Sequence, residues 1–217
     1  MVSAMPADET KVHLTLTQAE EPALSALLRR AGKWRLALRY MLGMDLRLET
    51  EDRRVLEQVI FPYYVDASLY RRVLFVGCDW YTNDYRRDFF DTADFWTLDP
   101  LPRVRRFAGR QHVVGLLEDL PRYFPENRFD LIICNGVFGF GLNARENCER
   151  AFAACHSRLR EGGHLVLGWN DIPERRPLAL DSLASLRAFR PFLFPPLGTA
   201  HFLTNTTYRH VYDFFQR

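Results

Sequence analysis

The sequence has little net charge, almost no lysine and no long apolar run. Its 29 basic and 27 acidic residues leave a formal net charge of +2, and Lys11 and Lys33 are its lysines. A nucleic-acid-binding surface needs a larger and clustered basic excess, whereas the arginine pairs of this chain are scattered. No apolar run approaches the roughly 18 residues that a transmembrane helix needs. We therefore expect no nucleic-acid partner and no membrane partner.

Cysteine pairs and metal-site spacings are also missing. Cys78, Cys134, Cys148 and Cys155 form no C-x-x-C pair and none of the spacings typical of zinc sites. The first residues show no secretory signal pattern. We expect a cytoplasmic protein with reduced thiols and without a bound metal.

What the sequence does contain is an α/β pattern. Its candidate strands are short apolar runs at 73–76, 95–98, 112–116, 131–134 and 165–169. A segment with helical spacing of apolar residues, 144–159, separates the last two runs. Short buried strands that alternate with helices predict a doubly wound, mostly parallel Rossmann-like sheet. A chain of 217 residues is long enough for one such domain with a full core.

The two ends of the chain depart from this pattern. Between residues 22 and 60, apolar residues recur every three or four positions, which predicts N-terminal helices that pack on the core. Pro62 is expected to end the last of these helices. Runs at 201–206 and 210–215 predict a closing antiparallel strand pair. We divide the chain into a lead-in with helices at 1–69 and an α/β domain at 70–217.

Polar and aromatic side chains gather at the ends of the predicted strands. Ligands of open α/β sheets bind beyond the carboxyl ends of the strands, so these residues are the candidates for a binding site. In chain order they are Gly77, Cys78, Asp79, Tyr81, Asp99, Glu118, Asp119, Asn135, Phe138, Phe140, Trp169, Asn170 and Asp171.

Several segments resemble, in order and spacing, the motifs of the class I S-adenosylmethionine (SAM)-dependent methyltransferases. They read R-V-L-F-V-G-C at 72–78, E-D-L-P at 118–121, F-D-L-I-I at 129–133 and L-R-E-G-G-H-L-V-L at 159–167. The resemblance covers about residues 70–170. It implies that strand 73–76 lies at the centre of the sheet, between strands 95–98 and 131–134, and that SAM is the cofactor. It also implies that Cys78 and Cys134, which end neighbouring strands, lie close together.

The resemblance further implies roles for individual residues. Asp99 takes the place of the acid that binds the two ribose hydroxyls, and Gly77 would lie beneath the methionine part of SAM. The full cofactor-binding set is Gly77, Cys78, Asp79, Asp99, Glu118, Asp119 and Asn135. The expected substrate-binding set is Tyr81, Phe138, Phe140, Trp169 and Asn170.

Two positions depart from the family pattern. The first loop of the family is typically G-x-G-x-G, because glycines let the backbone approach the cofactor. This chain reads G-C-D-W-Y at 77–81, with Asp79 and Tyr81 in place of the later glycines. Leu116 stands where the family often has an acid that reaches the adenine amino group.

Some residues allow two interpretations. Asp79 either contacts the amino group of a bound amino-acid moiety or caps the following helix. Asp99 either binds ribose or ends its strand in an Asp-Pro turn. Asp171 is our candidate general base, or else part of a turn before Pro173.

The loop 135–143, with three glycines and two phenylalanines, is suited to covering a ligand. The histidines give no catalytic candidate. His112 and His164 open strands at the opposite edge of the sheet, and His156 lies on a helix. We therefore assign no catalytic histidine.

The leading hypothesis is SAM-dependent methyl transfer to a small-molecule acceptor. A sulfonium is already an activated methyl donor, so proximity and orientation carry most of the rate and no catalytic dyad is required. The alternative, favoured by the substituted glycines, is a methyltransferase-like domain without methyl-transfer activity that acts as a binding or partner subunit. A nicotinamide-dependent oxidoreductase is disfavoured, because no G-x-G-x-x-G follows the first strand.

Overall fold

The computed structural model describes residues 49–66 and 70–217. The helices expected between residues 22 and 48 lie outside the described residues. The helical segments before the sheet are α2 (Glu51–Val55), the π-helical η1 (Leu56–Ile60) and α3 (Phe61–Asp66). They belong to the same compact unit as the sheet that follows them.

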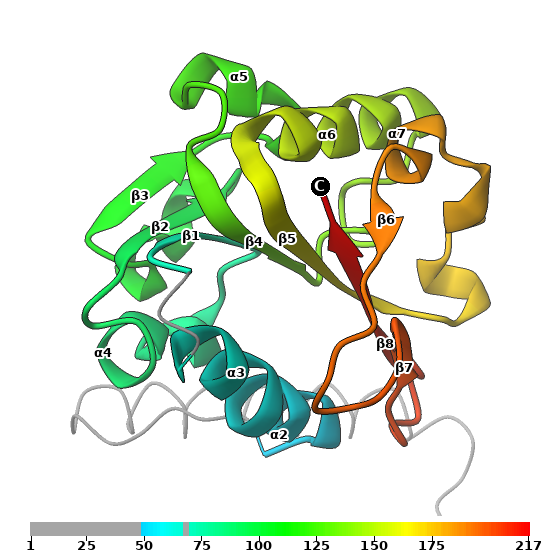
Figure 1. Cartoon of the computed structure of the whole chain (residues 1–217), viewed down its shortest axis with the longest axis horizontal. Helices are drawn as coiled ribbons and strands as arrows, with labels where there is room; N and C mark the ends of the chain where they lie inside the picture. Colours follow the sequence, from blue (N-terminus) through cyan, green and yellow to red (C-terminus); the bar gives the residue numbers. More distant parts are fainter. Residues whose placement is uncertain (1–48, 67–69) are drawn as a thin grey trace, which may run out of the picture. The chain divides into compact units, whose positions relative to one another are not determined.

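The strands form one mixed sheet in the order β3-β2-β1-β4-β5-β8-β6, and β7 also pairs with β8 (Figure 1). Their bounds are β1 Arg72–Val76, β2 Asp94–Asp99, β3 Gln111–Val114, β4 Phe129–Asn135, β5 Leu159–Asn170, β6 Arg190–Pro191, β7 His201–Leu203 and β8 His210–Gln216. The first five strands are parallel, and β8 runs antiparallel to β5 and β7. The Rossmann-like fold, the place of β1 between β2 and β4, and the antiparallel C-terminal strands are therefore confirmed.

Helices cover both faces of the sheet. They are α4 (Tyr85–Asp88), α5 (Leu120–Tyr123), α6 (Arg145–Arg158) and α7 (Ala184–Arg187), with 3₁₀-helical turns η2 (Trp80–Thr82), η3 (Pro102–Phe107), η4 (Leu117–Asp119), η5 (Pro173–Arg175) and η6 (Leu180–Ser182). Helices α5 to α7 lie on one face and α2 to α4 on the other (Figure 1).

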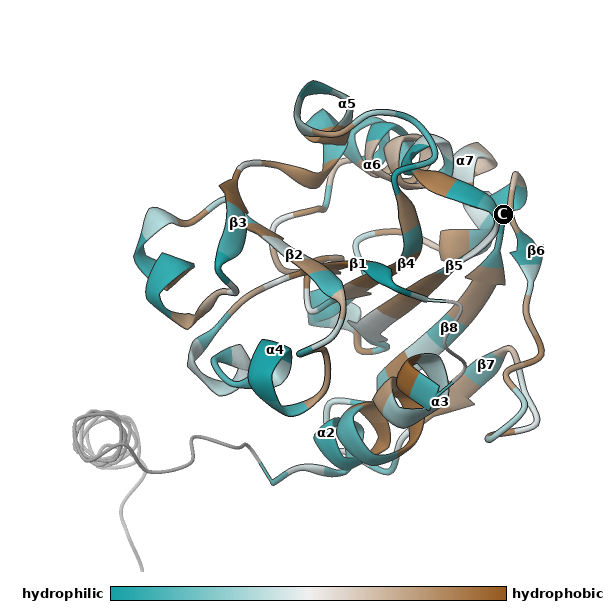
Figure 2. Cartoon of the chain, turned by 60° about the vertical axis from the view of Figure 1, so that its left-hand side comes forward, coloured by the Kyte–Doolittle hydropathy of each residue, from teal (hydrophilic) through white to brown (hydrophobic). Residues whose placement is uncertain are grey.

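Alternation along the strands divides the core into two layers. In β1, Leu74 and Val76 pack with Cys148 and Phe152 of α6 on one face. Val73 and Phe75 face the other way, into the layer formed by the helices at 51–66. Successive side chains of a strand point to opposite faces, so a strand covered on both faces reads as a continuous apolar run. The central strands are accordingly hydrophobic along their length (Figure 2).

The prediction that Pro62 ends the N-terminal helix is wrong. The helix continues through α3 to Asp66, and the turn before Pro62 is the π-helical η1. There the N–H of Phe61 bonds to the carbonyl of Leu56, five residues back. A proline has no N–H to donate and crowds the preceding α-helical turn, so a widened turn accommodates it.

The side chains of Cys78 and Cys134, which we expected to lie close together, belong to different layers of the core, although β1 and β4 are neighbours. Cys134 pairs with Val76 and belongs to the α6 layer with Cys148 and Cys155, whereas Cys78 belongs to the opposite layer. Gly77 has φ of +95° and forms a turn at the end of β1. Cys78 therefore no longer follows the alternation of side chains between the two faces of the sheet. All four cysteines are free, and burial raises the pKa of Cys78 and of Cys134 to about 12.

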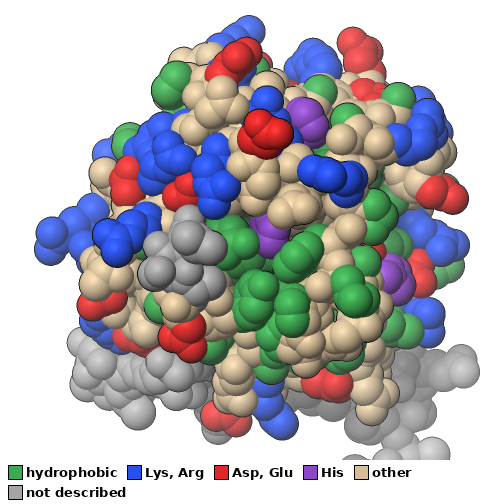
Figure 3. Space-filling model, in the orientation of Figure 1, with side chains coloured by type: hydrophobic (Ala, Val, Ile, Leu, Met, Phe, Trp, Pro, Cys, Tyr) green, Lys and Arg blue, Asp and Glu red, His purple; other side chains and the backbone are tan. Residues whose placement is uncertain are grey.

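Charged side chains of both signs surround a central group of hydrophobic side chains on the face shown in Figure 3. Among the helices of the described part of the chain, none has both the length and the apolar character required to cross a bilayer.

Candidate functional site

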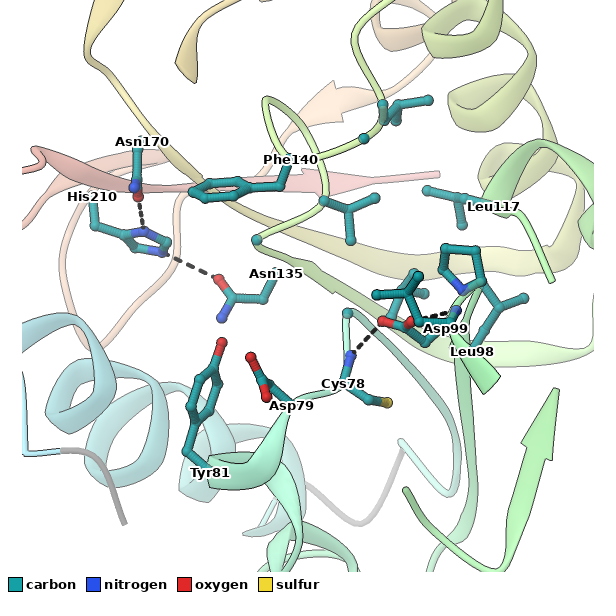
Figure 4. Close-up of a pocket in the computed structure, with 18 of the residues that line it drawn as sticks. Cys78, Asp79, Tyr81, Leu98, Asp99, Leu117, Asn135, Phe140, Asn170 and His210 are labelled. Carbon is teal, nitrogen blue, oxygen red and sulfur yellow. Dashed lines mark hydrogen bonds between the residues drawn. The ribbon is translucent and has the colours of Figure 1, made fainter. Parts of the chain in front are cut away.

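A cavity of about 630 Å³ lies at the carboxyl ends of β1, β2 and β4 (Figure 4). Its volume is within the range of roughly 300–1,000 Å³ that is usual for small-molecule sites. The predicted site residues that line it are Gly77, Cys78, Asp79, Tyr81, Asp99, Glu118, Asn135, Phe140 and Asn170. The sheet edge expected from the sequence is therefore the edge that carries a cavity.

The carboxylate of Asp99 is held in one orientation at the end of β2. One oxygen accepts the N–H of Cys78 at 3.0 Å and the other accepts the N–H of Leu101 at 2.8 Å. The side chain is 7% exposed and lines the cavity. A carboxylate has about four acceptor positions, so each oxygen can still accept a ligand hydroxyl. The turn interpretation and the ligand interpretation of Asp99 are thus compatible.

The loop after β1 brings backbone and side chains to the cavity. A Cβ at Gly77 would lie 2.2 Å from the carbonyl oxygen of Asn135, so glycine is required there by the neighbouring strand. Asp79 forms a capping box on η2: its side chain accepts the N–H of Trp80 at 2.7 Å, and its own N–H donates to the hydroxyl of Thr82. Asp79 therefore caps this turn and also lines the cavity.

The structure places four predicted site residues outside the cavity lining, namely Asp119, Phe138, Trp169 and Asp171. Asp119 lies 3.6 Å from Arg122 in an ion pair.

Phe138 is fully buried against Trp169, and the indole N–H of Trp169 donates to Asp213 at 2.7 Å. Strand alternation explains this, because Asn170 faces the cavity and Trp169 therefore faces the α6 layer. Asp171 lies beyond the strand, in ion pairs with Arg176 and Arg209. Asp171, our candidate general base, is therefore paired with two arginines and does not line the cavity.

Five charged or polar residues that sequence reasoning missed line the cavity: Thr50, Asp52, Arg53, Tyr208 and His210. Arg53 lies three and seven positions before the buried Leu56 and Ile60, so the helical spacing could have identified it as an inward-facing arginine.

His210 is the first residue of β8, which is antiparallel. An antiparallel strand starts at the edge where its parallel neighbours end, so the rule that strand starts lie far from the site does not apply to it.

A chain of hydrogen bonds connects these residues to Asn135. The Nδ1 atom of His210 lies 2.7 Å from the oxygen of Asn170, and Nε2 lies 3.1 Å from the amide of Asn135 (Figure 4). Burial lowers the pKa of His210 and Arg53 lowers it further, against the opposing effect of Asp52, so the ring is neutral near pH 7. A neutral ring has one N–H, which donates to Asn170, and Nε2 accepts.

The neutral ring determines the orientation of the Asn135 amide. Its nitrogen donates to Nε2 of His210, and its oxygen then accepts from Nη1 and Nη2 of Arg53 at 3.1 and 3.2 Å. Gly168 makes this arrangement possible, since a Cβ there would lie 1.9 Å from the amide of Asn135. Asn135, His210 and Arg53 therefore act as one unit at the base of the cavity.

The loop after β4 contributes one exposed ring. Phe140 is 46% exposed, lines the cavity and has the guanidinium of Arg175 4.2 Å from its centre. Gly139 has φ of +82°, and a Cβ there would lie 2.0 Å from the carbonyl oxygen of Arg175. The loop is thus closely packed on the segment after β5, with Phe140 at the cavity.

The charges around the cavity are mainly negative. Among the described residues that line it, Asp52, Asp79, Asp99 and Glu118 are acidic and Arg53 is basic. This balance favours a ligand with a positive centre. The described residues contain no group of three side chains that could hold a metal ion.

Comparison with known proteins agrees with this architecture. Residues 74–167 match a family model described as a methyltransferase domain. No curated protein was found with significant sequence similarity to the chain. The N-methyltransferase NodS from Bradyrhizobium japonicum WM9 is a similar solved structure, with 15% identity, a TM-score of 0.57, and 78% of this chain and 99% of that chain covered.

The same N-methyltransferase in complex with S-adenosyl-L-homocysteine is similar with a TM-score of 0.53, at 15% identity over 78% of this chain and 93% of that chain. A TehB-like SAM-dependent methyltransferase from Corynebacterium glutamicum has 21% identity and a TM-score of 0.54, with 90% of this chain and 99% of that chain covered. The chain therefore has the fold of these SAM-dependent methyltransferases, and residues 74–167 match a methyltransferase domain.

Proposed function

We propose that the chain transfers a methyl group from SAM to a small-molecule acceptor in the cavity at the carboxyl ends of β1, β2 and β4. The observation that carries the proposal is the carboxylate of Asp99, held by two backbone N–H groups with acceptor positions left for a ligand. It ends the strand next to the glycine turn of β1, inside the segment that matches a methyltransferase domain.

The residues present fit the cofactor. Asp99 offers two fixed oxygens to the neighbouring hydroxyls of a ribose. Leu101, Leu116, Leu117 and Leu142 line the cavity and supply apolar contacts for a base. The excess of carboxylates over cations favours a sulfonium, and SAM when bound supplies an activated methyl group on that sulfur.

In this reaction the protein binds the cofactor and the acceptor and aligns them. Tyr81, Asn170, Tyr208 and Phe140 line the cavity and would surround an acceptor. Because the leaving group is already activated, holding the acceptor in line with the methyl group supplies most of the acceleration. Such a site does not require a catalytic pair of acid and base, and sequence reasoning identified no such pair. The four free, buried cysteines suit a reducing, cytoplasmic setting for this activity.

Titration calorimetry with the product S-adenosylhomocysteine tests the cofactor site. Asp99→Ala removes charge-assisted hydrogen bonds of about 1.5–3 kcal/mol each, so affinity should fall about ten- to a thousandfold. Asp119→Ala is the matched control, because this neighbouring acid lies outside the cavity lining and should leave affinity unchanged. Equal affinities of wild type and Asp99→Ala would refute the site.

Turnover distinguishes the enzyme from a binding domain. Formation of S-adenosylhomocysteine is measured with SAM and a panel of amine, hydroxyl, thiol and carboxyl acceptors. Acceptor-dependent product supports methyl transfer. Tight cofactor binding without product for any acceptor class would favour the alternative of a partner subunit without methyl-transfer activity.

A further inference from the structure

The strand β3 forms an edge of the sheet and has unpaired main-chain groups. Among the described residues, no strand lies beyond β3 (Figure 1). The N–H of Gly115, just after β3, donates to the carbonyl of Asp99 at the end of β2. The main-chain groups of successive residues in a strand point to alternate sides, so those of His112 and Val114 point away from β2. Within the described part of the chain, no main-chain hydrogen bond reaches these outward groups, which leaves them able to pair with a further strand.

A group of exposed arginines comes directly before this edge strand. Residues 100–117 contain no acid and four exposed arginines, namely Arg103, Arg105, Arg106 and Arg110. We call these four residues the arginine group. No ion pair joins any of the four to a described residue, whereas Arg122 and Arg128 pair with acids. The arginine group is therefore a local positive charge in a chain whose formal net charge is +2.

The arginine group lies beside β3. Arg110 is the residue before β3 begins, and η3 carries the other three arginines. Burial lowers the pKa of His112, and the nearby guanidinium of Arg105 lowers it further, against the opposing effect of Asp99. Lys and Arg side chains gather at the left of Figure 3, over the end of the sheet that β2 and β3 form in Figure 1. A segment paired with β3 would thus lie within reach of several guanidinium groups.

Exposed apolar side chains continue the same surface. Val114 at the end of β3 is 39% exposed, and Leu116, two residues later, is 45% exposed. Leu101, which follows the neighbouring strand β2, is 42% exposed. Apolar side chains that lie beside charged ones are typical of surfaces that bind other proteins.

We propose that β3 and the arginine group bind an extended acidic segment of another protein, which adds to the sheet as a further strand beside β3. Strand addition at a sheet edge pairs the free main-chain groups, and the side chains of the added strand give specificity. Guanidinium groups match carboxylates in shape and hydrogen bonding. Apolar residues that alternate with the acids of the added strand would contact Val114.

Other occupants fit this surface less well. A second copy of the chain would bring a second arginine group to the same edge, and like charges oppose such pairing. Nucleic acid or an anionic membrane would match the charge. Neither offers the regular row of N–H and C=O groups that pairs with His112 and Val114. An acidic peptide strand meets both requirements.

Fluorescence anisotropy with a labelled peptide that alternates glutamate and valine tests the charge. Replacing both Arg105→Gln and Arg110→Gln should weaken binding about two- to thirtyfold, as expected for the loss of two exposed ion pairs. The matched control combines Arg54→Gln and Arg190→Gln, two exposed arginines on α2 and β6, and should keep the affinity of wild type. A peptide with lysine in place of glutamate should not bind. Equal affinities of the two double variants would overturn the proposal.

A second peptide tests the main-chain pairing. It has the same sequence with N-methyl groups at alternate residues, which removes N–H donors and keeps the charge, and it should bind about tenfold more weakly. Hydrogen exchange at the amides of His112 and Val114 should slow when the unmethylated peptide is added, whereas Val113, whose amide points to β2, should change less. Equal affinities for the two peptides, or unchanged exchange at His112 and Val114, would show that no strand is added.

The competing partners are tested directly. Wild type is titrated with vesicles of phosphatidylserine and phosphatidylcholine and with a DNA duplex of mixed sequence. Weaker binding of both than of the acidic peptide supports the proposal. If either binds more tightly than the peptide and loses affinity in the Arg105→Gln and Arg110→Gln double variant, the arginine group serves that partner and the proposal is wrong.

Discussion

Gly168→Ala should reveal how much the unit of Asn135, His210 and Arg53 contributes to stability. The added Cβ would lie 1.9 Å from the side-chain amide of Asn135, at the atom that faces His210, with Nε2 of His210 at 3.0 Å. No Cβ occupies such a position in contact with a fixed amide, so Asn135 must move. The movement breaks its hydrogen bonds to His210 and Arg53.

The expected loss can be built from two contributions. Forcing an extra methyl group into a packed interior costs about 1–3 kcal/mol. Leaving a buried donor or acceptor unmet adds about 1–3 kcal/mol. The free energy of unfolding should therefore fall by about 2–6 kcal/mol, which for a domain of this size corresponds to roughly 4–24 °C in Tm.

Urea denaturation and thermal unfolding measure the effect against a matched control. Gly109→Ala adds the same methyl group where the nearest atom, in the ring of Phe95, lies 3.3 Å away and a shift of a few tenths of an ångström suffices. We expect a change below about 1 kcal/mol there. If Gly168→Ala were as stable as Gly109→Ala, the hydrogen-bonded unit would not be the tightly packed arrangement described above.

The remaining predictions concern pH and the loop after β4. His164 is buried between Tyr64 and Tyr70, and burial lowers its pKa from 6.5 to about 4. Since the unfolded chain takes up the proton first, the contribution of His164 to the free energy of unfolding should be level above pH 6.5 and fall by about 3 kcal/mol as pH drops towards 4. Urea denaturation at several pH values should show a smaller fall in His164→Gln than in the control His201→Gln, a surface position; equal falls would contradict this. Gly139→Val, whose side chain would meet the carbonyl of Arg175, should lower turnover more than affinity for S-adenosylhomocysteine, because Asp99 lies outside the loop. Hydrogen exchange of amides 136–142 should slow when S-adenosylhomocysteine is added to wild type, and exchange indifferent to the ligand would leave the loop a structural turn.

Local patterns in the sequence were sufficient for the strands themselves and for the edge that carries the cavity, whereas the central place of β1 in the sheet was predicted from the resemblance. Continuous apolar runs such as 73–76 and 131–134 indicate strands covered on both faces, and the carboxyl ends of such strands meet at one edge. Asp99 was found in this way, because its place depends only on where β2 ends. The same holds for Gly77, Asp79 and Asn135, which line the cavity as expected.

Only the tertiary structure decided which neighbouring side chains face the cavity. Asn170 and Phe140 line the cavity while Trp169 and Phe138 pack in the core, although all four are polar or aromatic residues of the same strand end or loop. Which of two adjacent residues points inward depends on strand register and on the turn that follows, and these are determined by contacts with distant segments.

Arg53 and His210 show the same dependence on distant contacts. They come from a helix before the sheet and from the start of an antiparallel strand, some 157 positions apart along the 217-residue chain. Neither has a local signature of a binding residue. Periodicity can place Arg53 on the inner face of its helix, but only the packing of that helix on the sheet and the pairing of β8 with β5 bring both side chains to Asn135. Composition and spacing describe each segment separately, and a site made of several segments exists only once they are packed together.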